Sequence, residues 1–455
     1  MLQFTNKKIY LKIALISWIF FWLSIGVTPK NLDYNLQSYA DIINIFRVYV
    51  PIFFVTILFI LIIIIKSSNQ EKNIKKKYFS FINLFLIYFF LQLIGLYQNK
   101  AVVFNLENLY LIILGFGVLE IFIINQFFDN KNLQYLLYIS IAICFLSSAL
   151  SFALLAIKND YYSFLDIINI NLRTIYDVNI ENKFFLNTAH PRSTGISRTF
   201  GLINICIILY LLFLVKKKIA QYLLHFSSFI YTSLIWLLQS RGSLLIFFST
   251  ISLIIFSLKK KVKEKIFLIL VLFFLPIMFS EVSIFIASNL NNTNTNANTD
   301  TNIQHKNRVL KDVSSSGRIT IWEESFKKYD KNKIFGYGPQ GDRFLLIYSE
   351  KASQFSNNAS NALVYSLLSG GYFAILIILL IYFNILIKIF ICIKKFDIFK
   401  NTDDINIMLS VSYALYFIIR SFFENSFSVF SIDFLIFIFS AIYIENYLKQ
   451  KQHLF

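Results

Sequence analysis

The chain has 455 residues, of which 57% are apolar and only 15% are charged, and its formal net charge is +18. Soluble domains are closer to half apolar and a quarter charged. With 52 Phe residues, the chain has more apolar surface than a water-soluble core could bury. The composition therefore excludes a soluble globular protein and predicts an all-α polytopic integral membrane protein.

Apolar stretches long enough for a membrane helix recur along the chain, and at roughly 20 residues per crossing they predict about twelve transmembrane helices. The predicted spans lie near residues 9–28, 47–65, 78–97, 107–127, 134–156, 199–215, 219–239, 242–258, 266–287, 367–393, 405–423 and 428–445. The first span follows a basic start and lacks a small-residue cleavage site, which favours a retained signal anchor.

The lysines predict the orientation. Clusters at 72–77, 216–218, 259–265 and 394–400 occupy every second loop, and cytoplasmic loops carry the excess of positive charge. Both termini are therefore predicted to be cytoplasmic, in a multi-pass protein of a bacterial cytoplasmic (inner) membrane with its active face in the periplasm. Topology and the anionic headgroups of membrane lipids account for the net charge, and no soluble basic domain remains to bind nucleic acid.

The predicted organisation has three parts. Residues 1–287 hold predicted helices 1–9, with an outer loop at 158–198. Residues 288–363 form a long extracytoplasmic loop, and residues 364–455 hold predicted helices 10–12 and a cytoplasmic C-terminus.

The long loop changes character along its length. It opens with an Asn/Thr-rich stretch, Asn289–Asn302, whose low complexity is typical of disorder. Further on, Ser316 is placed to cap a short helix whose Ile319, Trp322 and Phe326 share one face. We expect the aromatic side chains of Trp322, Phe326 and Phe335 to have a surface to pack against.

Arginine and lysine are distributed differently. In the predicted topology every Arg lies on the outer side or at an outer span end, whereas Lys supplies the cytoplasmic charge. A guanidinium group grips phosphate oxygens with two parallel donors, which an ammonium group cannot do. The set therefore indicates an anionic, phosphate-bearing ligand, although interfacial snorkelling is an equal alternative for any single Arg. The nine are Arg47, Arg173, Arg192, Arg198, Arg241, Arg308, Arg318, Arg343 and Arg420.

Four local motifs resemble the O-antigen ligase/polymerase family over roughly residues 185–440. An "SRG" turn precedes a span at Ser240-Arg241-Gly242, and the long loop carries Ser316-Gly317-Arg318 followed by Trp322. A Gly-rich turn follows at Phe335-Gly336-Tyr337-Gly338, and Glu424 stands near the last outer turn. Each motif is short, but their shared order and topology make the resemblance specific.

The resemblance implies the chemistry. A glycan is transferred from an undecaprenyl diphosphate carrier to an acceptor hydroxyl, without a cofactor or nucleotide sugar, and a flippase and a chain-length regulator are implied as partners. The polymerase branch extends a lipid-linked chain, and the ligase branch moves the finished chain to lipid A–core. Ligases carry a His-Asn pair where the long loop re-enters the membrane. Here Ser360-Asn361 stands there, which favours polymerase and leaves a ligase as the alternative.

The leaving diphosphate develops negative charge, which fixed arginines would stabilise. The predicted diphosphate clamp is Arg192, Arg198, Arg241 and Arg318, of which Arg241 and Arg318 are the main catalytic candidates. Glu424 is the candidate general base, and the alternative for it is an ion pair with Arg420.

The sequence gives less support to two other functions. Asp33 and Asp41 lie in the first outer loop, where some metal-dependent glycosyltransferases place an acid, but neither belongs to an acidic cluster and no metal is expected. A lipid-linked-oligosaccharide flippase or exporter would need cations along a cavity that opens to both sides, and it has no use for a structured outer loop.

Overall fold

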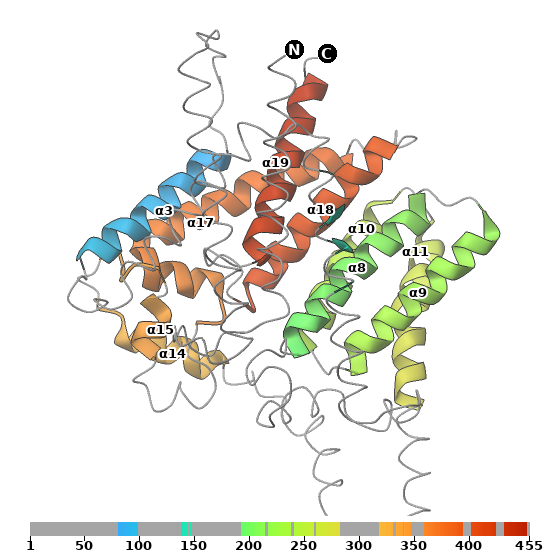
Figure 1. The fold of residues 1–455 in the computed structure, drawn as a ribbon, viewed down its shortest axis with the longest axis horizontal. Coiled ribbons are helices and arrows are strands. Elements are labelled where there is room, and N and C mark those ends of the chain that lie inside the picture. Colours follow the sequence, from blue (N-terminus) through green and yellow to red (C-terminus); the bar gives the residue numbers. More distant parts are fainter. Residues whose placement is uncertain are drawn as a thin grey trace, which may run out of the picture.

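A computed structural model gives the architecture of the chain (Figure 1). The structure describes residues 81–98, 193–213, 217–237, 241–258, 261–282, 318–330, 334–339, 341–346, 359–394, 402–424 and 432–452, with scattered positions between 134 and 146. The predicted spans near 9–28, 47–65 and 107–127 and the Asn/Thr-rich stretch lie outside the described residues.

All regular structure in the described residues is helical. The elements are α3 (Phe81–Gln98), α8 (Ser193–Phe213), α9 (Lys218–Leu237), α10 (Arg241–Ser257), α11 (Val262–Ile269), the π-helical turn η3 (Leu270–Phe274), α14 (Arg318–Lys328), α15 (Gly341–Leu346), α17 (Ala362–Lys394), α18 (Thr402–Ser421) and α19 (Ile432–Gln452). The all-α class is thus confirmed for this part of the chain, while the count of about twelve spans stays a prediction.

Three described helical stretches are long and apolar enough to cross a membrane: Phe81–Gln98, Val262–Val282 and Ala362–Lys394. Shorter apolar helices cover Ser197–Phe213, Gly242–Ser257 and Ile405–Ser421. These stretches coincide with spans predicted from hydropathy, and they are the pattern of an integral membrane protein. The orientation of the termini stays a prediction.

The helices pack as a bundle in which α17 lies along α3, α18 against α19, and α8 against α9 (Figure 1). α10 bridges α8 and α18. Polar contacts also join helices of the bundle. The Tyr413 hydroxyl of α18 donates to the Leu202 carbonyl of α8 over 2.8 Å, and Asn204 of α8 donates to the Thr232 hydroxyl of α9 over 2.9 Å. Lipid tails compete with apolar helix contacts, so buried hydrogen bonds of this kind help to specify the bundle.

α17 contains a break at Gly371, whose φ of 73° and ψ of −164° are not helical. A break leaves the carbonyls before it without their usual donors four residues later. The Gly-rich turn supplies replacements, because the Tyr337 amide donates to the Leu368 carbonyl and the Gly338 amide to the Ser369 carbonyl, each over 2.8 Å. The long loop is therefore fastened to a membrane helix through its backbone.

Glycine allows this close approach. A Cβ on Gly371 would stand 1.8 Å from the Ile334 carbonyl oxygen, and a Cβ on Gly95 of α3 would stand 2.4 Å from that of Phe335. Gly336 has a φ of 70°, in the left-handed region that glycine favours. The turn thus fits between α3 and α17 only because these positions have no side chain.

α14 forms where a helix was predicted, but its buried face differs. Ile321 and Ser325 are buried, whereas Ile319 and Phe326 are 50% and 57% exposed. The indole of Trp322 donates to the Ala359 carbonyl over 2.9 Å, which fixes the rotation of the helix and turns Ile321 toward Leu346. The prediction that Phe326 packs inward was therefore wrong.

We predict that Gly371→Ala will destabilise the fold. The positive φ with extended ψ at this position costs an alanine about 1–3 kcal/mol, and the 1.8 Å approach to the Ile334 oxygen forces the turn away from α17. Thermal unfolding of the detergent-solubilised protein should show a lower midpoint. Gly242→Ala is the control, because a Cβ there meets no atom within 4 Å. Equal midpoints for both variants would contradict the docking of the turn.

Candidate functional site

The segment from Ala359 to Asn361, where the long loop enters α17, is held by three neighbours. The Ala359 amide donates to Asp342 of α15 over 2.9 Å, and its carbonyl accepts from Trp322 of α14. The side chain of Asn361 caps α17 by accepting from the amides of residues 363 and 364, and its own amide donates to the carbonyl of Phe422 over 3.0 Å. We call this meeting of α14, α15, α17 and the end of α18 the loop junction.

Ser360 occupies the position at which a ligase is expected to have His. It lies between Ala359 and Asn361 in the loop junction. Its φ of 46° is in the left-handed region, an uncommon conformation for a residue with a side chain. Both of its neighbours are held by hydrogen bonds to other elements. The backbone at this position is therefore fixed by its surroundings rather than by local preference.

An ion pair stands beside the loop junction. Arg318, the first residue of α14, donates through Nη2 to Oε1 of Glu424 over 3.2 Å. The two side chains are 26% and 28% exposed. A single, fairly long contact between partly solvated groups contributes little stability, so either side chain can change partners at small cost.

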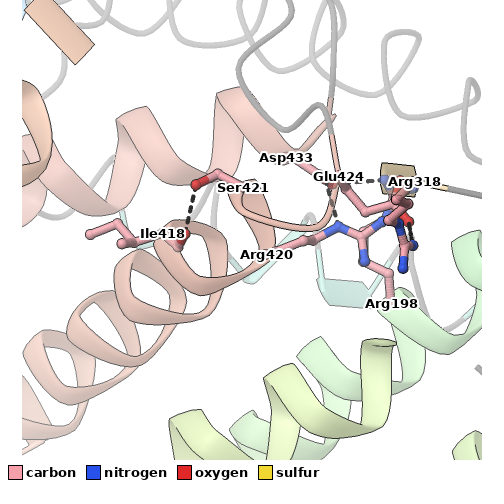
Figure 2. Close-up of polar contacts among 7 residues, drawn as sticks. All are labelled: Arg198, Arg318, Ile418, Arg420, Ser421, Glu424 and Asp433. Carbon is pink, nitrogen blue, oxygen red and sulfur yellow. Dashed lines mark hydrogen bonds and ion pairs between the residues drawn. The ribbon is translucent and has the colours of Figure 1, made fainter. Parts of the chain in front are cut away.

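A second, tighter cluster lies next to the first pair (Figure 2). Asp433, in the first turn of α19, accepts from Nη1 of Arg198 over 2.7 Å and from Nε of Arg420 over 2.8 Å. The side chains of Arg420 and Asp433 are each 5% exposed. This carboxylate joins α19 to α18, which precedes it in the chain, and to α8, whose Arg198 is 235 residues away in the sequence.

The structure brings together three of the predicted site residues, Arg198, Arg318 and Glu424 (Figure 2). Glu424 pairs with Arg318, and the alternative partner considered for it, Arg420, pairs with Asp433. Arg241 is the first residue of α10, but the position of its side chain is not among the described features. Arg192 lies outside the described residues.

Sequence reasoning missed Asp433. It lies inside a predicted span, 428–445, and an ionisable residue within a span is a functional candidate by default. That rule alone would have selected Asp433, although it could not have named its two partners. Asn361 was seen only as half of a motif, and its capping of α17 could not be read from the motif.

Tyr329, just after α14, is the described tyrosine closest in sequence to Arg318. Burial raises the pKa of its hydroxyl, and the neighbouring Tyr372 and Tyr337 act in the same direction. The hydroxyl therefore stays protonated at neutral pH, which makes Tyr329 a poor general base.

Comparison with known proteins bears on the region that contains the loop junction. Residues 226–379 match the model of a family described as O-antigen ligase. No curated protein and no solved structure matches the chain. The matched region holds Arg241 and Arg318, whereas Arg198, Glu424 and Asp433 fall outside it. The match covers less than half of the chain, and over residues 226–379 the chain is similar to the O-antigen ligase family, which indicates glycan assembly from lipid-linked substrates and does not separate polymerase from ligase.

Proposed function

We propose that this chain is a membrane glycosyltransferase that polymerises oligosaccharide repeat units carried on undecaprenyl diphosphate. The product would be a surface polysaccharide such as O-antigen, assembled on the outer face of the cytoplasmic membrane. The similarity of residues 226–379 to the O-antigen ligase family supports glycan assembly. The choice of polymerisation over ligation rests on Ser360 of the loop junction.

The observation that carries the proposal is the contrast between the two ion-pair groups. Arg318 and Glu424 share one 3.2 Å contact and are partly exposed, whereas Asp433 holds its two arginines at 2.7 and 2.8 Å in a buried setting. A pair that exchanges partners at little cost suits binding and catalysis. The buried carboxylate of Asp433 instead holds its two arginines in fixed positions beside that pair.

The proposed reaction gives each member of the exposed pair a role. The acceptor hydroxyl oxygen attacks the anomeric carbon of the donor sugar, and the bond from that carbon to the diphosphate oxygen breaks. The bonding electrons leave with the lipid diphosphate, where Arg318 stabilises the developing charge. Glu424, released from Arg318 by the incoming diphosphate, accepts the hydroxyl proton.

Ser360 favours the polymerase branch. A histidine at this position could exchange a proton near neutral pH, but a serine hydroxyl cannot. Among the residues that the structure describes, the histidine is His225, which belongs to α9. Transfer to lipid A–core, the ligase alternative, would therefore have to proceed here without the histidine that is expected in ligases.

The flippase alternative would need cations along a path through the bilayer. The arginines whose side chains the structure describes in ion pairs, Arg198, Arg318 and Arg420, instead lie beside the loop junction. Lys388 and Lys449, in the opposite part of α17 and α19, are both paired with Glu445, at 3.0 and 2.5 Å. These two lysines share one carboxylate and lie at the other ends of their helices, away from the loop junction. The distribution of cations thus supports chemistry at one face.

A strain that lacks this protein tests the branch. We expect lipid A–core capped with a single repeat unit, because a ligase elsewhere in the cell still transfers unextended units. Gel analysis of the lipopolysaccharide and of the lipid-linked pool measures this directly. Long lipid-linked chains together with uncapped core would contradict polymerisation and support the ligase alternative.

Arg318→Lys tests the role of the guanidinium group. Lysine keeps the charge and can still pair with Glu424, so the fold should persist, but it lacks the two-donor fork. Loss of such a contact at the leaving group costs about 2–4 kcal/mol, or roughly 30- to 1,000-fold in rate. Chain extension, measured by glycan ladder length, should fall accordingly at a normal protein level.

Arg308→Lys is the matched control, because this arginine follows the Asn/Thr-rich stretch and belongs to no family motif. Its ladder should equal that of the unmodified protein. A normal ladder for Arg318→Lys would show that positive charge alone suffices, and the proposed role of Arg318 would be abandoned.

A further inference from the structure

The cluster around Asp433 carries more positive than negative charge. Its one carboxylate faces two guanidinium groups, those of Arg198 and Arg420, whose side chains are 15% and 5% exposed. Burying a charge without a partner is costly, and one carboxylate neutralises only one of the two arginines. Adding Arg318 and Glu424 leaves the excess unchanged, at three positive against two negative side chains among these described residues.

Donors in this cluster also lack acceptors. Nη1 of Arg420 and Nε of Arg198 are buried and have no hydrogen-bond partner in the described part of the chain. The buried hydroxyl of Tyr416, close to the Arg420 guanidinium, also has no partner in hydrogen-bond geometry. Buried polar groups are nearly always satisfied, so unsatisfied donors beside an excess positive charge point to an absent anion.

The chemistry of the donors narrows the class of anion. Two guanidinium groups held by one carboxylate present several N–H donors in fixed directions, which matches the oxygens of a phosphate group. The exposed Arg318–Glu424 pair adjoins the cluster (Figure 2), and the main chain connects the two, because the Glu424 amide donates to the Arg420 carbonyl over 2.9 Å. When the exposed Arg318–Glu424 pair separates, a phosphate would be able to reach the guanidinium groups of the cluster.

We infer that Arg420, together with Arg198, binds a phosphate group of the lipid diphosphate, and that Asp433 is the positioning residue that holds both guanidinium groups for it. This inference rests on the proposed function and adds two residues to the predicted site. Arg420 lies at the end of α18 and Asp433 at the start of α19. The phosphate would supply the missing negative charge and accept from the unsatisfied donors.

Binding of two probes to the purified full-length protein in detergent tests the inference. The probes are farnesyl diphosphate, which has a lipid tail, and inorganic pyrophosphate, which has none. Arg420→Lys should keep the charge paired with Asp433 and unfold near the normal temperature. Its dissociation constant for both probes should rise roughly 10- to 100-fold, as expected for a lost hydrogen bond between charged groups.

Lys388→Arg is the matched control, since it alters a partly buried cation that is likewise paired with a carboxylate, Glu445, at 3.0 Å. It should bind both probes as the unmodified protein does. If Arg420→Lys does not fold, Asp433→Glu replaces it: the charge is kept, the guanidinium groups are displaced by one methylene length, and binding should weaken about 10-fold while the unfolding temperature changes little.

The outcomes separate the inference from the proposed function. Normal affinity of Arg420→Lys or Asp433→Glu for farnesyl diphosphate would overturn the inference, even with a lowered unfolding temperature, because a purely structural role predicts that result. Weakened binding of pyrophosphate alone would also overturn it, since the site would then take free phosphate rather than a lipid headgroup. Failure of the unmodified protein to bind either probe would instead overturn the proposed function.

Discussion

A backbone that breaks inside an apolar helix must find new hydrogen-bond partners, and this requirement governs the half of the described structure that contains the loop junction. The carbonyls of Leu368 and Ser369, just before the break in α17, accept from the amides of Tyr337 and Gly338. Unsatisfied backbone groups are costly in a lipid environment, so the Gly-rich turn cannot leave without a penalty. The turn also contacts both short helices, because the Tyr337 hydroxyl accepts from the Asp330 amide just after α14 and the Gly338 carbonyl accepts from the Gly341 amide of α15. α14 in turn holds the segment that carries Ser360, because Trp322 donates to the Ala359 carbonyl.

The same frame explains why the charges near the loop junction fall into two groups. Asp433 sits in the first turn of α19 and ties the ends of three packed helices, so its arginines are held tightly and buried. Arg318 begins a short helix of the loop, and Glu424 lies in the turn after α18, so their contact is single and partly solvated. Packing thus separates a fixed cationic framework from a pair that can exchange partners during a reaction.

The sequence predicted the parts of this arrangement that depend on local composition. Hydropathy placed α3, α10 and α17 within a few residues, because a bilayer demands long apolar runs. It could not place Asp433 beside Arg198, 235 residues away in the chain, because ion pairing between distant helices depends on how they pack. For the same reason the inward face of α14 was mispredicted: the indole of Trp322 and its distant acceptor, not helical spacing, set the rotation.

Reconstitution of the purified protein in lipid vesicles, with lipid-linked repeat units as the sole substrate, tests the central claim most directly. Polymerisation by this chain predicts lipid-linked products of several repeat units, with one undecaprenyl diphosphate released for each bond formed. Released diphosphate matched to product length would show that the chain itself breaks and makes the glycosidic linkage. Unextended substrate that either crosses the bilayer or is transferred only when lipid A–core is added would contradict polymerisation by this protein.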